Sequence, residues 1–368
     1  AITLVSSLMP LAALPVSMMI TGRAMPDLQA LVGNVIPMVI VGVFALYAAR
    51  IAHQLRTQAD AARQIGSYEL LEQIGEGAMG QVWRAKHRLL ARDAALKLIQ
   101  PDAMGEDPEH AETRFEREAR ATAALASPHT VALYDYGRSD EGTYYYAMEL
   151  LDGLTLDSMI RTHGPLPEAR ALYLLRQIAL SLAEAHRAGL VHRDVKPANV
   201  FVSSAGIEQD YIKVLDFGLV KSTSRTARDV QLTQEHVPTG TPAFMSPETV
   251  LGETIDGQSD LYSLGCTLYW MLTGELVYDE DTPLKMMMAH VHQTPLPPSQ
   301  RTELHITPEV DALVMRCLER DRSARFRDAQ QLLEAVEEVA GRMSHPWTQK
   351  DAQAWWARRP VQSTRAAC

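Results

Sequence analysis

The stretch LVHRDVKPANVFV, residues 190 to 202, places several chemically able side chains between two apolar runs. It contains the acid Asp194, the bases Arg193 and Lys196, and the amide Asn199. Such groups can accept a proton, neutralise charge or form hydrogen bonds. A second acidic motif, VLDFG, places Asp216 directly after an apolar run. These residues can act together only if the elements that carry them converge.

A glycine motif lies upstream, in YELLEQIGEGAMGQVWRAKHR. Gly75, Gly77 and Gly80 have the spacing GxGxxG, and apolar alternation resumes at Val82 and Trp83, which indicates strand, glycine turn, strand. In a dinucleotide-binding fold the motif should open a helix. In a hairpin it lets backbone N–H groups approach a phosphate. Taken alone, the motif is also compatible with an ordinary turn.

Lys97 lies within the apolar strand pattern DAALKLI and needs an anion, because an unpaired buried ammonium is costly. One source of the anion is a pair of phosphates. Another is Glu118, in the helical pattern TRFEREARATAAL. For Glu118 itself, a surface pair with Arg114 at i,i+4 is the alternative.

Composition excludes some classes of protein. The chain has 368 residues, 46% of them hydrophobic, which suffices for one large domain or two ordinary ones. A formal net charge of -10 argues against non-specific binding to nucleic acid. The cysteines Cys266, Cys317 and Cys368 lie far apart and have no metal-type spacing, which suits a reducing compartment.

The first 49 residues are apolar enough to cross a membrane twice. Residues 1–22 and 28–49 carry no charge, and about 20 apolar residues span a bilayer. We expect a transmembrane helix in each, although a signal peptide is the alternative for the first run. Arg50, Arg56 and Arg63 follow the second run, so the remainder should be cytoplasmic.

Residues 50–67 are expected to form a juxtamembrane linker, either as a spacer or as a route for signal transmission or dimerisation. Because the sequence starts without Met, we expect further sequence upstream, where any extracytoplasmic sensor would lie.

The motifs HRDVKPAN, VLDFG and MSPE, with the glycine loop and strand lysine upstream, together resemble the protein-kinase signature set. The resemblance covers about residues 68–340 and is to the bacterial eukaryotic-like (Hanks-type) transmembrane serine/threonine kinases. It implies an α+β, two-lobed protein-kinase fold preceded by the two membrane helices. A small β-rich N-lobe with the hinge would span residues 68–151, a larger α-helical C-lobe 152–340, and a C-terminal tail 341–368.

The resemblance assigns catalytic roles. Asp194 would accept the proton of the substrate hydroxyl, and Lys196 would stabilise the transferring phosphate, as in serine/threonine rather than tyrosine kinases. Asn199 and Asp216 would supply oxygen ligands to Mg²⁺, or to Mn²⁺ in its place.

The resemblance also implies an ATP site. Lys97 would hold the α- and β-phosphates while paired to Glu118. The adenine would lie between Ile74, Val82 and Ala95 on one side and Phe201 on the other. The full set of expected nucleotide-binding residues is Ile74, Gly75, Glu76, Gly77, Ala78, Met79, Gly80, Gln81, Val82, Ala95, Lys97, Met148, Glu149, Leu151 and Phe201.

Other positions would be structural. Glu248 and Arg325 would form a buried ion pair in the C-lobe, and Asp260 would brace the catalytic loop. Solvated surface charge is the alternative for Asp260 or Arg325 considered alone. The segment Leu261–Leu272 is apolar nearly all round and predicts a central buried helix.

Arg193 beside the catalytic acid marks the kinases in which an anionic activation segment pairs with that arginine. Thr233 is the expected phosphorylated residue, Thr239 a further acceptor, and Thr241 is expected to contact Asp194 and Lys196.

The tail contains WTQKDAQAWWARR, in which Thr348 and Asp351 have capping-box-like spacing. A short helix here would present Trp355 and Trp356. It would pack on the kinase domain, on a partner or on the membrane surface.

The predicted protein is a serine/threonine protein kinase of the cell (inner) membrane, with its kinase domain in the cytoplasm. It would transfer the γ-phosphate of ATP to protein substrates in signal transduction, and phosphorylate its own activation segment within a homodimer. A catalytically inactive, nucleotide-binding scaffold is the alternative, which the presence of every catalytic residue disfavours. A transporter is excluded because the two apolar runs carry no ionisable residue.

Overall fold

The computed structural model describes residues 40–41, 43–51, 64–77, 80–99, 108–139, 142–217 and 242–358. The chain divides into two compact units, Ala1–Ile65 and Gly66–Cys368. In the first unit, residues 40–41 and 43–51 are helical, and strand β1 spans Gln64–Ile65. The predicted span at 1–22 and most of that at 28–49 lie outside the described residues. Within the described ranges, no helix combines the length and apolar character needed to cross a membrane.

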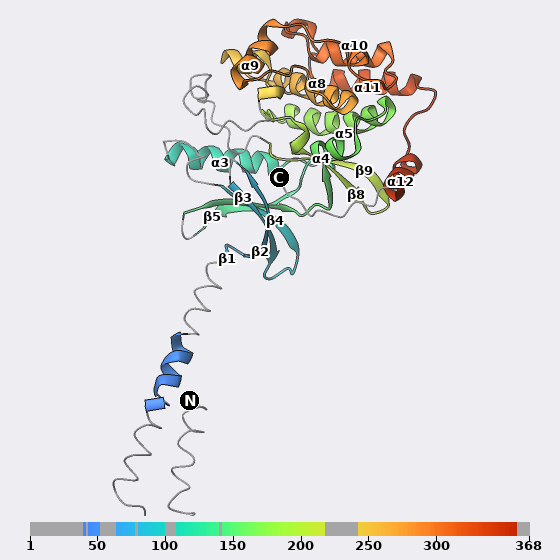
Figure 1. Cartoon of the computed structure of the whole chain (residues 1–368). Helices are drawn as coiled ribbons and strands as arrows, with labels where there is room; N and C mark the ends of the chain where they lie inside the picture. The colour runs from blue at the N-terminus through green and yellow to red at the C-terminus, as the bar shows by residue number, and fades with distance from the viewer. Residues whose placement is uncertain are drawn as a thin grey trace, which may run out of the picture. The chain divides into compact units, whose positions relative to one another are not determined.

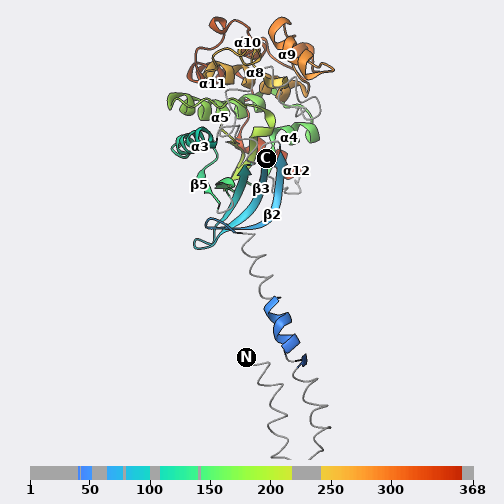
Figure 2. The same ribbon diagram turned by 90° about the vertical axis from the view of Figure 1, so that its left-hand side faces the viewer.

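The second unit begins with an antiparallel sheet (Figure 1). Its strands are β2 (Tyr68–Gly77), β3 (Gly80–His87), β4 (Asp93–Ile99), β5 (Leu133–Arg138) and β6 (Tyr144–Glu149), in the order β2-β3-β4-β6-β5. Helix α3 (Pro108–Ala123) lies beside β5 in both views (Figures 1 and 2). It buries Phe115, Ala119 and Thr122, which lie on one face of the helix.

Gly80 closes the glycine hairpin and pairs with Gly77 across the strands. Its φ is +143°, and a Cβ at this position would lie 1.8 Å from the carbonyl oxygen of Leu98. Only glycine therefore fits where β3 begins against β4.

The helical lobe follows the sheet along the chain. Its helices are α4 (Leu156–His163), α5 (Glu168–Arg187), α7 (Pro247–Leu251), α8 (Gly257–Thr273), α9 (Pro283–His292), α10 (Pro308–Cys317), α11 (Ala329–Arg342) and α12 (Gln349–Arg358). Short 3-10 turns are η2 (Pro197–Asn199), η3 (Pro242–Phe244), η4 (Pro298–Gln300) and η5 (Arg322–Ala324). A second sheet has the order β7-β8-β9, with β7 at Gly153–Thr155, β8 at Val200–Ala205 and β9 at Glu208–Val214.

Helix α8 is the centre of this lobe. The side chain of Asp256 caps its first turn, and Gly274 ends it with a left-handed φ of 70°. Nearly every residue between these caps is buried, including Leu261, Leu264 and Leu268. An apolar helix too short to span a membrane therefore forms the core around which the other helices pack.

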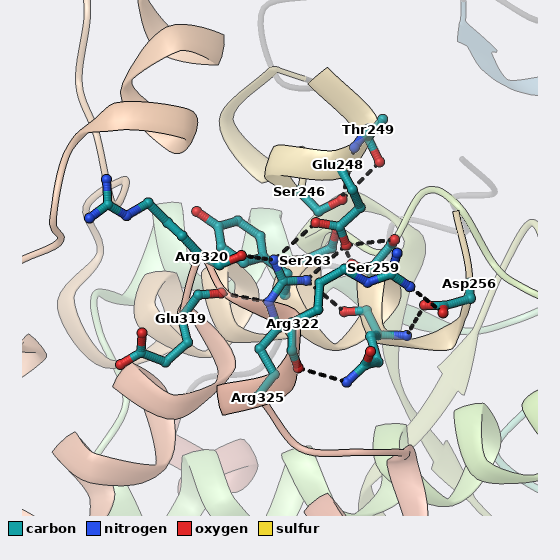
Figure 3. Close-up of polar contacts among 12 residues, drawn as sticks. Ser246, Glu248, Thr249, Asp256, Ser259, Ser263, Glu319, Arg320, Arg322 and Arg325 are labelled. Carbon is teal, nitrogen blue, oxygen red and sulfur yellow. Dashed lines mark hydrogen bonds and ion pairs between the residues drawn. The ribbon is translucent and has the colours of Figure 1, made fainter. Parts of the chain in front are cut away.

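A buried ion pair ties α7 to the turn at η5 (Figure 3). Arg325 donates to Glu248 Oε1 at 2.8 Å and to Oε2 at 2.9 Å, and its Nε donates to the carbonyl of Glu319 at 2.6 Å. Ser259 of α8 also donates to Glu248 at 2.7 Å. Burial alone would raise the pKa of Glu248, but the hydrogen bonds and charge of Arg325 outweigh it and hold that pKa below its ordinary value.

Replacing Arg325 by leucine should lower the free energy of unfolding by about 3–5 kcal/mol, because Glu248 then keeps a buried charge without its cation. The double variant Arg325→Leu/Glu248→Leu should recover most of that loss. Urea denaturation at neutral pH measures both. Arg327→Ala, which breaks an exposed pair with Asp328, is the control and should change nothing measurable. A loss at Arg325 as small as the control's would contradict the structural role.

Candidate active site

The loop that carries Asp194 is held by one buried carboxylate. Asp260 of α8 accepts the backbone N–H of His192 at Oδ2 and that of Arg193 at Oδ1, each at 2.8 Å. His186 Nε2 lies 2.8 Å from the same Oδ2. Arg193 has a left-handed φ of 64°, a conformation that non-glycine residues adopt at a cost. Asp260 therefore fixes the bend that presents Asp194.

Asp194 lies between a cation and an amide. Lys196 Nζ is 3.0 Å from Asp194 Oδ2, and Asn199 Nδ2 donates to the same oxygen at 3.0 Å. Asn199 Nδ2 also donates to the backbone carbonyl of Asp194 at 2.8 Å. Because the amide nitrogen is committed to these bonds, the orientation of Asn199 is set and its oxygen faces away from them.

Asp216 is approached from the sheet by two residues that lie opposite each other on β4 and β6. Lys97 Nζ donates to its Oδ2 and Tyr146 Oη to its Oδ1, both at 2.6 Å. Burial alone would raise the pKa of Asp216, but the charge and hydrogen bond of Lys97 and the bond from Tyr146 hold it below the ordinary value. Burial beside Asp216 raises the pKa of Tyr146 well above its usual range, so Tyr146 keeps its proton and donates.

The expected pairing of Lys97 with Glu118 is not the one in this structure. The ammonium of Lys97 binds Asp216, and a carboxylate oxygen of Glu118 lies 3.9 Å from the guanidinium of Arg193. The physical reason is that Asp216, at a left-handed φ of 55°, places its carboxylate within direct reach of Lys97, while Glu118 has Arg193 of the catalytic loop among its contacts. The buried ammonium does have its anion, but a different acid supplies it.

An apolar cluster adjoins these polar groups. Val82, Ala95, Met148 and Phe201 are buried together, with Ile74, Leu151 and others packed against them. These residues belong to the two sides of the expected adenine pocket: strands of the first sheet supply one side, and Phe201 of β8 supplies the other. The side chain of Glu149 accepts from Lys213 Nζ at 2.6 Å.

The structure describes only part of the expected glycine loop and none of the expected activation-segment threonines. Gly75, Glu76 and Gly77 end β2, and Gly80 and Gln81 begin β3. Ala78 and Met79 lie outside the described residues, as do Thr233, Thr239 and Thr241 of the activation segment.

The oxygen donors suit a hard cation. Asn199 and Asp216 lie at the two ends of the β8–β9 hairpin, which are tied by a bond from Leu215 N–H to the carbonyl of Asn199 at 2.9 Å. Among the described residues there is no group of three or more His, Cys, Asp or Glu side chains that could hold a metal. Two protein ligands completed by phosphate oxygens and water are the pattern that Mg²⁺ prefers.

Sequence reasoning missed Tyr146. No sequence signal marks it, because its position opposite Lys97 follows only from the pairing of β4 with β6, and no spacing rule links it to Asp216.

Replacing Lys97 by methionine should raise the pKa of Asp216 above its ordinary value, because burial then outweighs the single bond from Tyr146. In the natural chain, the depressed pKa contributes stability that is complete above the unfolded value of about 3.9 and is lost as pH falls through the native value. A carboxyl ¹³C NMR titration measures the shift. An unchanged or lower pKa in the variant would contradict the assigned partner.

Comparison with known proteins agrees with this geometry. Residues 68–336 match the family model described as protein kinase domain. The chain is 39% identical over 268 residues to serine/threonine-protein kinase PknB of Mycolicibacterium smegmatis, covering 72% of this chain and 41% of that protein. It is 35% identical to serine/threonine-protein kinase pkn3 of Myxococcus xanthus, covering 75% of this chain and 51% of that one.

The crystal structure of the Mycobacterium tuberculosis PknI kinase domain superposes with a TM-score of 0.59 at 27% identity, covering 75% of this chain and 98% of that one. The chain thus spans about half or less of the length of these two curated relatives, and nearly all of a solved kinase domain. It belongs to the protein kinase family, among the bacterial serine/threonine kinases of the Hanks type.

Proposed function

We propose that this chain is a membrane-anchored kinase that transfers the γ-phosphate of ATP to serine and threonine hydroxyls of proteins. The observation that carries the proposal is the placement of Asp194 between Lys196 and Asn199, on a loop fixed by Asp260. Phosphoryl transfer depends on positioning and charge neutralisation, which such an arrangement supplies.

Each residue has a defined task. Asp194 orients the acceptor hydroxyl and takes its proton, and Lys196 neutralises charge on the phosphate as it moves. Asn199 and Asp216 would hold Mg²⁺, which neutralises the phosphate oxygens when bound. Lys97 donates to Oδ2 of Asp216 and Tyr146 to Oδ1. With nucleotide bound, Lys97 would turn to the phosphates and leave Oδ2 of Asp216 open to the metal. Glu118 is then the acid that can pair with Lys97.

Replacing Asp194 by asparagine keeps the side-chain shape and removes the proton acceptor. The rate of phosphate transfer should fall about 10²–10⁴-fold, the usual contribution of a general base, while ATP affinity stays within about twofold. Labelled-phosphate transfer to a generic protein substrate and nucleotide titration measure the two effects. Equal transfer by the variant would overturn the assignment.

The same variant tests autophosphorylation. Asp194→Asn chain mixed with natural chain should gain label only if one copy phosphorylates another, and peptide mapping then shows whether Thr233 is the acceptor. Arg193, whose guanidinium is 3.9 Å from Glu118, is the cation that we propose to bind the phosphate on Thr233. Active chain without label at Thr233 would exclude that residue.

The proposed membrane anchor is supported by the helical residues of the first unit. Ile40, Val41, Val43, Phe44 and Tyr47 are all exposed there, with Phe44 at 72%. Apolar surface of this extent on one helix is unusual in water. The full chain should remain in the membrane fraction after an alkaline carbonate wash, whereas release into the supernatant would contradict the anchor.

A further inference from the structure

Helix α12 and the two residues before it, Trp347 and Thr348, pack on the β8–β9 hairpin (Figure 1). This contact involves a segment that lies far along the chain from the catalytic loop. Ala352 of α12 is fully buried, and Thr348 Oγ1 donates to Asp351 Oδ2 at 2.5 Å at the start of the helix. The tail therefore packs on the kinase domain, one of the three surfaces that its sequence allowed.

The contact is centred on a buried ion pair. Arg170 of α5 donates two hydrogen bonds to Asp210 of β9, from Nε to Oδ2 at 2.9 Å and from Nη2 to Oδ1 at 2.7 Å. Neither side chain is exposed to solvent. Two indole N–H groups complete the carboxylate: Trp347 donates to Oδ2 at 2.9 Å and Trp356 to Oδ1 at 2.7 Å. Each oxygen of Asp210 thus accepts one guanidinium bond and one indole bond.

Aromatic rings also cover the cation. The guanidinium of Arg170 lies 3.8 Å from the ring centroid of Trp355, 5.2 Å from that of Trp347 and 5.8 Å from that of Trp356. A desolvated guanidinium among aromatic faces is stabilised by the ring quadrupoles. The three tryptophans cover this ion pair without bringing any charge of their own to it. The tail thus seals a charge pair that would otherwise meet water.

The tail also binds the hairpin backbone. Gln349 exchanges two hydrogen bonds with Gln209, receiving its N–H and donating to its carbonyl, both at 2.9 Å. From the other side, Gln177 of α5 donates to the carbonyl of Asp210 at 2.9 Å and accepts from Ile212 N–H at 3.0 Å. Asp210 itself has a left-handed φ of 55°, so these bonds hold a bend that the backbone does not favour.

The hairpin so held carries the expected metal ligands at its two ends. β8 begins at Val200, directly after Asn199, and β9 ends at Val214, two residues before Asp216. We propose that residues 347–358 act as a clamp on this hairpin, and that Asp210, Trp347 and Trp356 are positioning residues for Asn199 and Asp216. The proposal rests on the kinase function proposed above for those two ligands.

The double variant Trp347→Phe/Trp356→Phe in the full chain keeps the aromatic rings and removes both N–H donors to Asp210. Amide hydrogen exchange in residues 200–205 and 208–214 should accelerate about a hundredfold, because each of the two lost hydrogen bonds to a charged group contributes about tenfold. The Mg²⁺ concentration for half-maximal phosphate transfer should rise about tenfold, as for loss of outer-shell support, with KM for the protein substrate unchanged.

Gln353→Ala is the matched control, because it removes a bond from the same helix to the exposed hairpin turn, at the carbonyl of Ile207, and should change neither quantity. Faster exchange confined to residues 347–358, with the hairpin protected and the Mg²⁺ dependence unchanged, would overturn the clamp. If the double variant does not fold, Trp356→Phe alone should show a smaller change in the same two quantities. If the natural chain transferred no phosphate, the proposed kinase function would fail. Amide hydrogen exchange of the hairpin would still test the clamp, because that measurement does not depend on catalysis.

Discussion

The conformation of the catalytic loop depends on the carboxylate of Asp260. This side chain projects from α8, the most buried helix of the described chain, and accepts the backbone N–H groups of His192 and Arg193. Those bonds offset the cost of a left-handed Arg193, and that bend places Asp194 beside Lys196 and Asn199. Because α8 is held in place by the apolar core of the lobe, Asp260 is held in place too, and it in turn fixes the position of Asp194.

Two other buried acids, Glu248 and Asp210, also join separate segments of the lobe through their carboxylate oxygens. Glu248 joins α7 to the turn that contains Arg325, and Asp210 joins the β8–β9 hairpin to α5 and to the tail. All three carboxylates are 2% exposed or less. An acid so deeply buried is costly unless its oxygens are fully bonded, and each of these receives at least three hydrogen bonds or charged contacts. Buried carboxylates that do not themselves take part in catalysis thus hold the segments that carry the catalytic residues.

Much of this arrangement could be predicted from the sequence. The order of the motifs gave the fold, the burial of α8 followed from its all-round apolar pattern, and the Thr348–Asp351 spacing marked the start of α12. The partner of Lys97 could not be predicted, because sequence shows that a buried ammonium needs an anion but not which of two nearby acids lies closer. Tyr146 and Asp210 escaped notice for a related reason: each acts through a contact between elements more than 40 residues apart in the chain, and neither belongs to a local motif.

The measurement that tests the central claim most directly is the chemical identity of the residue that receives phosphate. The full chain, incubated with Mg²⁺ and γ-labelled ATP, would be hydrolysed in acid and its labelled amino acids separated. Label on phosphoserine or phosphothreonine is the predicted result. Nucleotide binding without any labelled amino acid, or label on phosphotyrosine alone, would contradict the assignment of Asp194 and Lys196 as the machinery of a serine/threonine kinase.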